Sequence, residues 1–361
     1  MLELNIYDKK TIPNIYLLLD LVAIGTVADV VKLDLNNRIM VRLGLDLIHR
    51  KMTRPGVMAL AKVARRDLTN LTTQDIGFGI APRINAAGRL EDMSLGIQLL
   101  LTENDDTAHK LALELDRINR SRKEIEVEMK EQALQMPEVH YGEFTKVAFD
   151  ESFHEGVIGI VASRIKDNFY RPTIVFAPAQ EEGMLKGSGR SIPEVHLRDA
   201  LDLVSKKDPA LLAKFGGHAM AAGLTIKKDD LNKFMEFFEE AVAHFVGNKK
   251  LVNVREVDMR LSHKHLNMEL AELIRKEVWG QGFSAPLFYG EFEVLNQKII
   301  KEAHLKLTLV DELNQKHEAM WFFRENMIEA DRINCVYTLG INEFLNEKTM
   351  QISIEDLIVL N

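Results

Sequence analysis

The stretch Asn104–Met129, NDDTAHKLALELDRINRSRKEIEVEM, carries the clearest helical pattern of the chain. Its apolar residues recur at steps of three and four positions, which places them on one face of an α-helix. Asp105 and Asp106 lie in the expected first turn, where carboxylates interact favourably with the helix dipole. The other positions carry charges of both signs. We therefore predict a long, solvated helix that connects two domains.

The sequence on either side of this helix has two different patterns. Before it, the apolar stretch Leu17–Val31 and the pattern of residues 36–101 predict a helical unit. After it, strands are expected at Lys146–Phe149 and Thr173–Ala177, on either side of an apolar helix at Val157–Phe169. Strand, helix and strand in this order are typical of an α/β layer. Short helices are expected further on, one of them at residues 210–215.

The last part of the chain changes to short alternating strands after a linker at Gly247–Lys250. Five strands are predicted, at Leu287–Leu295, His304–Val310, Glu318–Phe323, Asn334–Leu339 and Met350–Val359. This spacing is typical of a small β-barrel of the oligonucleotide-binding (OB) type. The fold is therefore predicted to be α/β and multidomain, with divisions at residues 1–103, 104–136 for the long helix, 137–246 and 251–361.

The composition restricts the class of protein. The 361 residues suffice for two or three domains, and their globular composition excludes a disordered or disulfide-stapled protein. Cys335 is the single cysteine, which favours a reducing, cytoplasmic setting. No apolar run reaches the roughly 18 residues of a membrane span, so no membrane partner is expected. The net charge of −8 argues against an overall basic coat, but it allows a local basic groove.

Two carboxylates flank a Gly-Thr turn in the segment Asp20–Asp29, DLVAIGTVAD. Mg²⁺ and Mn²⁺ prefer hard carboxylate oxygens, so this pair is a candidate metal site. The alternative is that Asp20 and Asp29 each cap a helix. The spacing alone leaves both interpretations open.

A second motif lies in residues 81–90, APRINAAGRL, where Arg83, Asn85 and Arg89 surround small residues. Small residues allow a ligand to approach the backbone closely, and forked guanidinium groups suit phosphate oxygens. The alternative is a surface helix start with ordinary ion pairs.

Glycine-rich turns in the predicted α/β unit supply further candidates. His154 stands in the turn before the helix at Val157–Phe169, and helix N-termini favour anions. Arg190 and Ser191 end the segment GSGRS at residues 187–191. The simpler explanation for each is a turn glycine beside structural side chains.

The segment GGHAMAAG, residues 216–223, places His218 directly after Gly216 and Gly217 and before a run of small residues. Glycines let the backbone pass close to a ligand, and small residues allow tight packing behind it. A lone histidine is more often structural, but this setting favours a role in binding.

Aromatic and basic residues alternate with apolar ones in the last part of the chain. The segment Trp279–Phe283 is WGQGF, and the predicted strand His304–Leu309 is HLKLTL. A polar strand face beside aromatic side chains can bind a single nucleic-acid strand. A solvated sheet face is an equally simple alternative.

The order of these motifs resembles the RecJ-type exonucleases of the DHH phosphoesterase family over essentially the whole chain. The resemblance implies the end of a DHH catalytic domain, a long connecting helix, an α/β DHH-associated domain and a C-terminal OB-type barrel. It also implies 5′-to-3′ hydrolysis of single-stranded DNA in repair and recombination, with Mn²⁺ or Mg²⁺ as cofactor. Single-stranded DNA is the implied partner, with a single-strand-binding protein and a helicase as further candidates.

The sequence departs from the family at its N-terminal motifs, because it contains no Asp-x-Asp and no adjacent histidine pair. Most metal ligands are therefore expected outside this chain, with Asp20 matching one remaining ligand. The resemblance implies a catalytic role for Asp20 and for His218, which would contact the scissile phosphate. It implies that the substrate is bound by Arg83, Asn85, Arg89, His154, Arg190, Ser191, Gly216 and Gly217. We expect a strand-binding portion without nuclease activity of its own.

Two other functions are compatible with parts of the sequence. A smaller DHH oligoribonuclease or nucleotide phosphatase would share the Gly-Gly-His segment, but it would not explain the C-terminal strands. A non-catalytic single-strand-binding or replication-scaffold relative would explain the missing motifs. Retention of Asp20, Arg190 and His218 together does not favour that second alternative.

Overall fold

The computed structural model describes residues 13–135, 140–301, 303–344 and 347–359. The chain divides into two compact units. The first comprises residues 1–82, 99–109 and 255–361, and the second comprises residues 83–98 and 110–254. Among the described residues, no helix is long and apolar enough to cross a membrane. The domain bounds proposed from the sequence stay a prediction.

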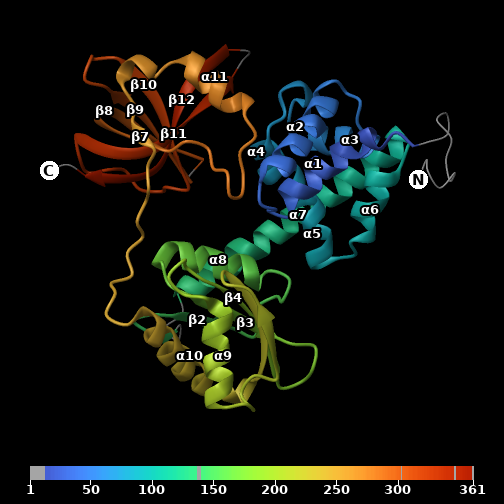
Figure 1. Ribbon diagram of the computed structural model, residues 1–361, viewed down its shortest axis with the longest axis vertical. Helices are drawn as coiled ribbons and strands as arrows, with labels where there is room; N and C mark the ends of the chain where they lie inside the picture. The colour runs from blue at the N-terminus through green and yellow to red at the C-terminus, as the bar shows by residue number, and fades with distance from the viewer. Residues whose placement is uncertain (1–12, 136–139, 302, 345–346, 360–361) are drawn as a thin grey trace. The chain divides into compact units, whose positions relative to one another are not determined.

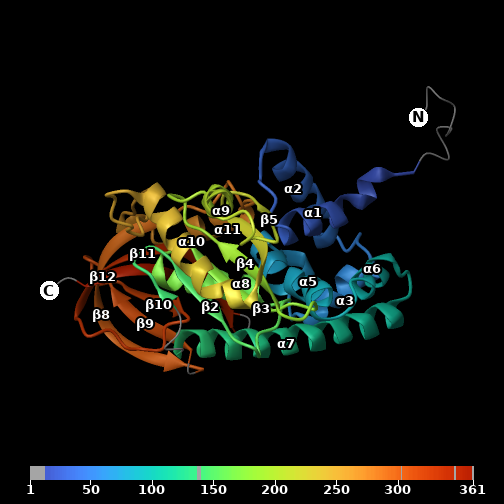
Figure 2. The same ribbon diagram turned by 90° about the horizontal axis from the view of Figure 1, so that it is seen from below.

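The long helix predicted from the sequence is confirmed. Helix α7 spans Asp105–Gln135, and Figure 2 shows it as one continuous helix. Its apolar stripe is buried as expected, with Ala108, Leu115 and Ile118 almost fully removed from solvent. The division between the two units falls inside this helix, between His109 and Lys110.

The first unit contains a group of short helices. They are α1 (Leu19–Ala28), α2 (Leu35–His49), α3 (Pro55–Val63), α4 (Thr73–Asp75) and the start of α5 (Ala81–Leu90), while α6 (Ser94–Leu101) lies partly in each unit. Helices α1 and α2 pack very closely, because Gly44 has no side chain. A Cβ atom there would lie 2.1 Å from the carbonyl oxygen of Leu19. This close contact fixes how α1 lies on the rest of the unit.

The first unit also contains a closed β-sheet. Its strands are β7 (Met259–Arg260), β8 (Phe288–Ile300), β9 (His304–Val310), β10 (Lys316–Phe322), β11 (Arg332–Phe344) and β12 (Glu347–Val359), with helix α11 (Met268–Lys276) (Figure 1). The order is β11-β12-β10-β9-β8-β7, and an added β11–β8 pairing closes strands β8 to β12 into a ring. Strands β10 and β12 run parallel and the other ring pairs antiparallel. This five-stranded ring matches the OB-type fold predicted from the sequence.

The second unit is an α/β layer. Its sheet has the order β1-β2-β3-β4-β6-β5, with β1 (His140–Tyr141), β2 (Lys146–Phe149), β3 (Thr173–Pro178), β4 (Met184–Arg190), β5 (Lys214–Gly217) and β6 (Ala221–Lys227). One core contains sheet residues and residues of α9 (Leu197–Lys207) and α10 (Leu231–Val246). A separate core contains residues of α8 (Ile158–Phe169) and α7. Buried side chains therefore lie on both faces of the sheet.

One predicted helix of the second unit is wrong. Residues 210–213 form a turn that leads into β5, and Lys214 and Phe215 already belong to that strand. Strand β5 pairs with β6, where Phe215 faces Leu224 and Gly216 faces Gly223. Pairing with a distant strand therefore decides the structure of this segment, against its local helical pattern.

The single cysteine gives a test of the ring. Cys335 lies on β11 with no exposed surface, and burial raises the pKa of its thiol to about 12. Since the thiolate is the reactive form, we expect the folded chain to resist a thiol reagent at pH 8. The guanidinium-unfolded chain serves as the control and should react at one thiol per chain. Rapid, stoichiometric labelling of the folded chain would contradict this packing.

Candidate functional site

Asp20 is fully buried near the start of α1, and its carboxylate is already engaged. It accepts hydrogen bonds from the Thr53 hydroxyl at 2.8 Å and from the backbone N–H of Leu21 at 2.7 Å. It also forms an ion pair with the guanidinium of Arg54. A buried carboxylate needs such partners to offset the loss of water. Asp20 therefore ties α1 to the loop before α3.

Asp29 is the other carboxylate of this motif, and it is exposed at the C-terminal end of α1. The α1 terminus closes with two backbone hydrogen bonds, from Val31 N–H to Thr26 and from Val30 N–H to Val27. Val30 takes a positive φ of 55°. These features form a Schellman turn, in which the left-handed position is usually glycine.

Three of the predicted phosphate-binding residues lie together in the second unit. Arg89 lies in the last turn of α5 and donates to the carbonyl oxygen of Gly156 at 3.4 Å. The Nδ1 atom of His154 accepts from the N–H of Gly156 at 3.0 Å. Arg190 lies at the end of β4, where its guanidinium is close to Gly159 of α8. The sequence prediction thus selected side chains from three separate segments that meet at the start of α8.

Glycines make this approach possible. A Cβ atom at Gly159 would lie 2.8 Å from Nη2 of Arg190 and 3.0 Å from the Ser188 hydroxyl. A Cβ atom at Gly156 would lie 2.2 Å from the carbonyl oxygen of Arg89. The first turn of α8 has no side-chain cap, and the N–H groups of Val157 and Ile158 donate to the backbone carbonyl of His154. We call Arg89, His154, Ser188, Arg190 and the first turn of α8 the α8 cluster.

The electrostatics of the α8 cluster favour an anion. Desolvation lowers the pKa of Arg89, and the charge of Arg122 lowers it further, with Glu126 opposing both. Desolvation likewise lowers the pKa of Arg190, with a further contribution from the charge of Arg89. A lowered arginine pKa means that the positive charge is disfavoured where it stands. A bound phosphate would stabilise both charges.

Ser188 is a member of the cluster that sequence reasoning missed. Its hydroxyl accepts from the Arg190 guanidinium at 3.1 Å. The two residues are two positions apart on β4, so they point to the same face of the sheet. That spacing in GSGRS was the available signal.

The remaining predicted residues of the second unit lie in different settings. Arg83 is paired with Asp116 of α7, with 2.8 Å between Nη2 and Oδ1, as the ion-pair alternative describes. Asn85 is half-buried on α5. Ser191 is buried, and its hydroxyl donates to the carbonyl of Val195 at 2.6 Å.

The Gly-Gly-His segment forms the tip of the β5–β6 hairpin. Gly217 has φ 149°, and a Cβ there would lie 2.3 Å from the carbonyl oxygen of Ala221, so only glycine fits. His218 is exposed at this tip, while Gly216 faces open space. Strand β6 begins at Ala221, which pairs with Arg190. The hairpin tip and the α8 cluster therefore lie at the same end of the sheet.

The ring of the first unit carries an aromatic group at the start of β9. The His304 ring lies edge-on to Phe322 at 5.4 Å and to Phe323 at 5.2 Å between centroids. Phe323 is 82% exposed, which is unusual for a phenylalanine and leaves its ring available for stacking. Nearby in sequence, the guanidinium of Arg324 lies 4.7 Å over the Trp321 ring. We call these residues the ring aromatics.

Comparisons with known proteins agree on one family. Residues 142–244 match the DHHA1 domain, and residues 257–356 match the RecJ OB domain. The chain is 42% identical to the single-stranded-DNA-specific exonuclease RecJ of Haemophilus influenzae and 44% identical to that of Escherichia coli, across 98% and 97% of its own length. The chain belongs to the RecJ family. It spans 64% and 63% of the length of these two RecJ relatives.

A solved RecJ structure supports the same assignment. The RecJ of Thermus thermophilus in complex with Mn²⁺ matches 97% of this chain and 51% of its own, with a TM-score of 0.81 and 27% identity. A second structure of that RecJ is in complex with Mg²⁺. The RecJ OB match accounts for the C-terminal strands that a smaller DHH relative would not explain.

Those metal-bound RecJ structures raise the question of which residues here fit a metal. In the part of the chain that the structure describes, no three carboxylate, histidine or cysteine side chains gather as a metal site would require. Asp20 is committed to Arg54 and Thr53. The described residues therefore do not hold a divalent ion by themselves.

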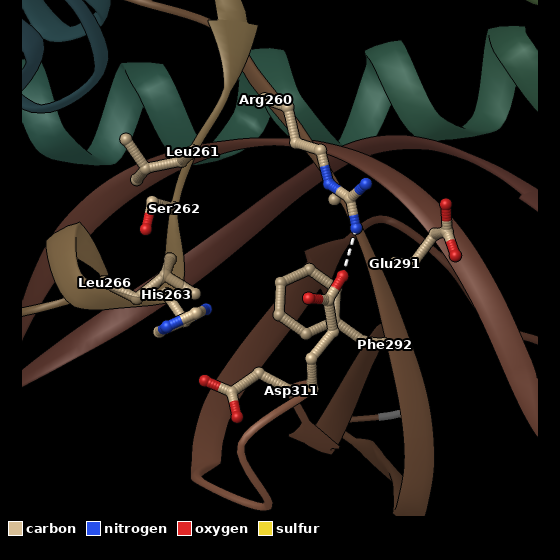
Figure 3. Close-up of a pocket in the computed structure, with 10 residues that line it drawn as sticks. Arg260, Leu261, Ser262, His263, Leu266, Glu291, Phe292 and Asp311 are labelled. Carbon is tan, nitrogen blue, oxygen red and sulfur yellow. Dashed lines mark hydrogen bonds and ion pairs between the residues drawn. The ribbon is translucent and has the colours of Figure 1, made fainter.

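The OB domain of this RecJ-family chain also has a pocket of about 300 Å³ (Figure 3). Arg260 reaches across it to form an ion pair with Glu312, and Glu291 and Asp311 also line it. With three carboxylates and one arginine, the pocket does not suit a nucleic-acid backbone.

Asp311 beside this pocket gives a pH-dependent test. Burial alone would raise the pKa of its carboxyl, but hydrogen bonds from His317, Gln315 and Leu313 lower the pKa overall. A lowered folded pKa stabilises the fold above the unfolded value, and this stabilisation is lost as the pH falls through the folded pKa. We expect Asp311→Asn to cost about 1–3 kcal/mol at pH 7, measured by urea unfolding. The gap from wild type should shrink below about pH 4. An equal gap at pH 3 and pH 7 would contradict this assignment.

Proposed function

We propose that this chain is the strand-binding part of a 5′-to-3′ exonuclease that degrades single-stranded DNA during repair and recombination. The observation that carries this proposal is the α8 cluster, where the guanidinium groups of Arg89 and Arg190 lie beside the first turn of α8. Guanidinium forks suit phosphate oxygens, and the positive end of the helix dipole favours the same anion. A 5′-terminal phosphate is the anion that such an enzyme must recognise.

The other groups at this end of the sheet extend the proposal. His218 and the glycines of the hairpin tip would contact the scissile phosphate, where an exposed imidazole and a backbone without side chains allow close approach. Arg83, Asn85 and Ser191 stay as predicted substrate residues, with Arg83 and Ser191 acting through the structure that they support. Asp20 would likewise act by fixing α1, and Asp29 is the carboxylate of that motif open to a ligand.

The ring aromatics would bind the following nucleotides. Bases stack on exposed aromatic rings with little sequence preference, and arginine adds cation–π attraction. Phe323 and the Arg324–Trp321 pair supply both kinds of group. The proposed cofactor is Mn²⁺ or Mg²⁺, held largely by residues outside the described part. A single-strand-binding protein, a helicase and a cytoplasmic location stay predictions from the family.

The α8 cluster predicts a preference for 5′-phosphorylated DNA. We expect the chain to bind a 5′-phosphorylated oligonucleotide about 10-fold or more tightly than its 5′-hydroxyl form, because charged hydrogen bonds each contribute roughly 1.5–3 kcal/mol. Arg190→Ala should abolish that preference. Arg198→Ala, an exposed arginine on α9, is the matched control and should keep it. Fluorescence anisotropy measures both, and an unchanged preference in Arg190→Ala would refute the site.

The ring aromatics and the missing metal ligands predict binding without cleavage. The purified chain should bind single strands with affinity that falls steeply with salt, and it should show no turnover with Mn²⁺. Phe323→Ala should weaken binding by roughly 1–3 kcal/mol, the usual value of one stacked base. Phe78→Ala, another exposed phenylalanine, is the control. Robust digestion by this chain, or binding indifferent to salt, would count against the proposal.

A further inference from the structure

The loop Trp279–Phe283 makes a specific contact with α2 inside the first unit. The Trp279 and Phe283 rings are stacked, with centroids 5.1 Å apart and planes 9° from parallel. The guanidinium carbon of Arg38 lies 3.5 Å from the centre of the Phe283 ring. Arginine over an aromatic face is an attractive cation–π contact. Phe283 thus joins α2 to the segment that follows α11.

Ion pairs reinforce this contact. Arg42 of α2 pairs with the Glu277 carboxylate at 2.8 Å and donates to the carbonyl oxygen of Lys276 at 2.6 Å. Arg38 also reaches Glu277, at 3.4 Å. Cations suit the C-terminal end of a helix, where carbonyl oxygens lack intrahelical partners. We call these arginines, Glu277 and the loop Trp279–Phe283 the clasp.

The clasp also binds the backbone just before α2. The N–H of Leu33 donates to the carbonyl of Gln281 at 2.7 Å. A Cβ at Gly280 would lie 2.8 Å from the Leu33 side chain, and Gly282, with φ 71°, would place one 2.9 Å from the Lys32 side chain. Both glycines are therefore needed for this approach. Leu33 is 4% exposed beneath the loop.

The segment that the clasp contacts, Lys32 and Leu33, follows a turn whose backbone is strained. Val30, two residues before Lys32, has the left-handed φ of 55° that a β-branched residue disfavours. Such a conformation persists only where the surrounding structure determines it. Its neighbour Asp29 is the exposed carboxylate of the motif that ends α1.

We propose that the clasp is a positioning element, through which the segment leading into the OB ring holds the Asp29–Asp34 turn in one orientation. Arg38 and Phe283 are its positioning residues. They hold the backbone at Lys32 and Leu33, which follow Asp29 in the same turn, without contacting DNA. That the orientation of this turn matters for the reaction rests on the proposed exonuclease function. That the clasp holds the turn does not depend on that function.

Hydrogen exchange at the amide of Leu33 tests the coupling directly in the purified chain. Its donor bond to Gln281 should make exchange slow in the wild type. We expect Phe283→Ala and Arg38→Ala to speed exchange at Leu33 by about 10-fold or more, while Leu307 in the ring stays protected. Phe283→Tyr, which keeps the stacked ring, should restore slow exchange. If Arg38 and Phe283 contributed only to the overall stability of the fold, their substitution would instead speed amide exchange throughout the unit, including at Leu307.

Phe323→Ala is the matched control, because it also removes a phenylalanine side chain, but one that is exposed and lies outside the clasp. It should weaken single-strand binding and leave Leu33 exchange unchanged, whereas Arg38→Ala should do the reverse. Unchanged Leu33 exchange in both Arg38→Ala and Phe283→Ala would overturn the proposal. Fast exchange at Leu33 in the wild type would overturn it as well. Absence of single-strand binding in the wild type would refute the proposed function and leave the clasp standing.

Discussion

Desolvation of the Arg89 and Arg190 guanidinium groups, which lie beside the start of α8, is the constraint on which the proposed site depends. Burial lowers the pKa of both arginines. The charge of Arg122 lowers that of Arg89 further, with Glu126 opposing, and the charge of Arg89 lowers that of Arg190. Such an arrangement is costly unless an anion completes it. The sheet, the long helix and the glycines at the start of α8 together keep the charges of Arg89 and Arg190 close to each other.

The fold was predictable where one segment decides its own structure. The bounds predicted for β2 and β9 agree with the structure, because their alternating or continuous apolar residues suit one strand each. The apolar steps of α7 likewise predicted one long helix. The conformation of residues 210–215 was not predictable, because it depends on pairing with β6. Local pattern and distant pairing conflict there, and the pairing prevails.

The chemical type of the candidate site could be predicted from the sequence, but the roles of its individual residues could be predicted only in part. The glycine and arginine motifs indicated a phosphate site, and Arg89, His154 and Arg190 do converge. Asp20, however, is buried against Arg54, a partner 34 positions away that no local spacing reveals. Arg83 is similarly taken up by Asp116. A charged residue type shows that a charge must be compensated, but it does not show by which group.

The sequence by itself determined the long helix, the OB-type strands and the family to which the chain belongs. The tertiary structure alone decided which carboxylate of the Asp20–Asp29 motif is exposed, and which loop lies against Lys32 and Leu33. The physical reason is that burial and ion pairing depend on which groups are neighbours in three dimensions, and the separation of residues along the chain does not determine this. The contact of Phe283 with Arg38 shows this best, because two residues so far apart in the chain cannot be paired from the period of the sequence.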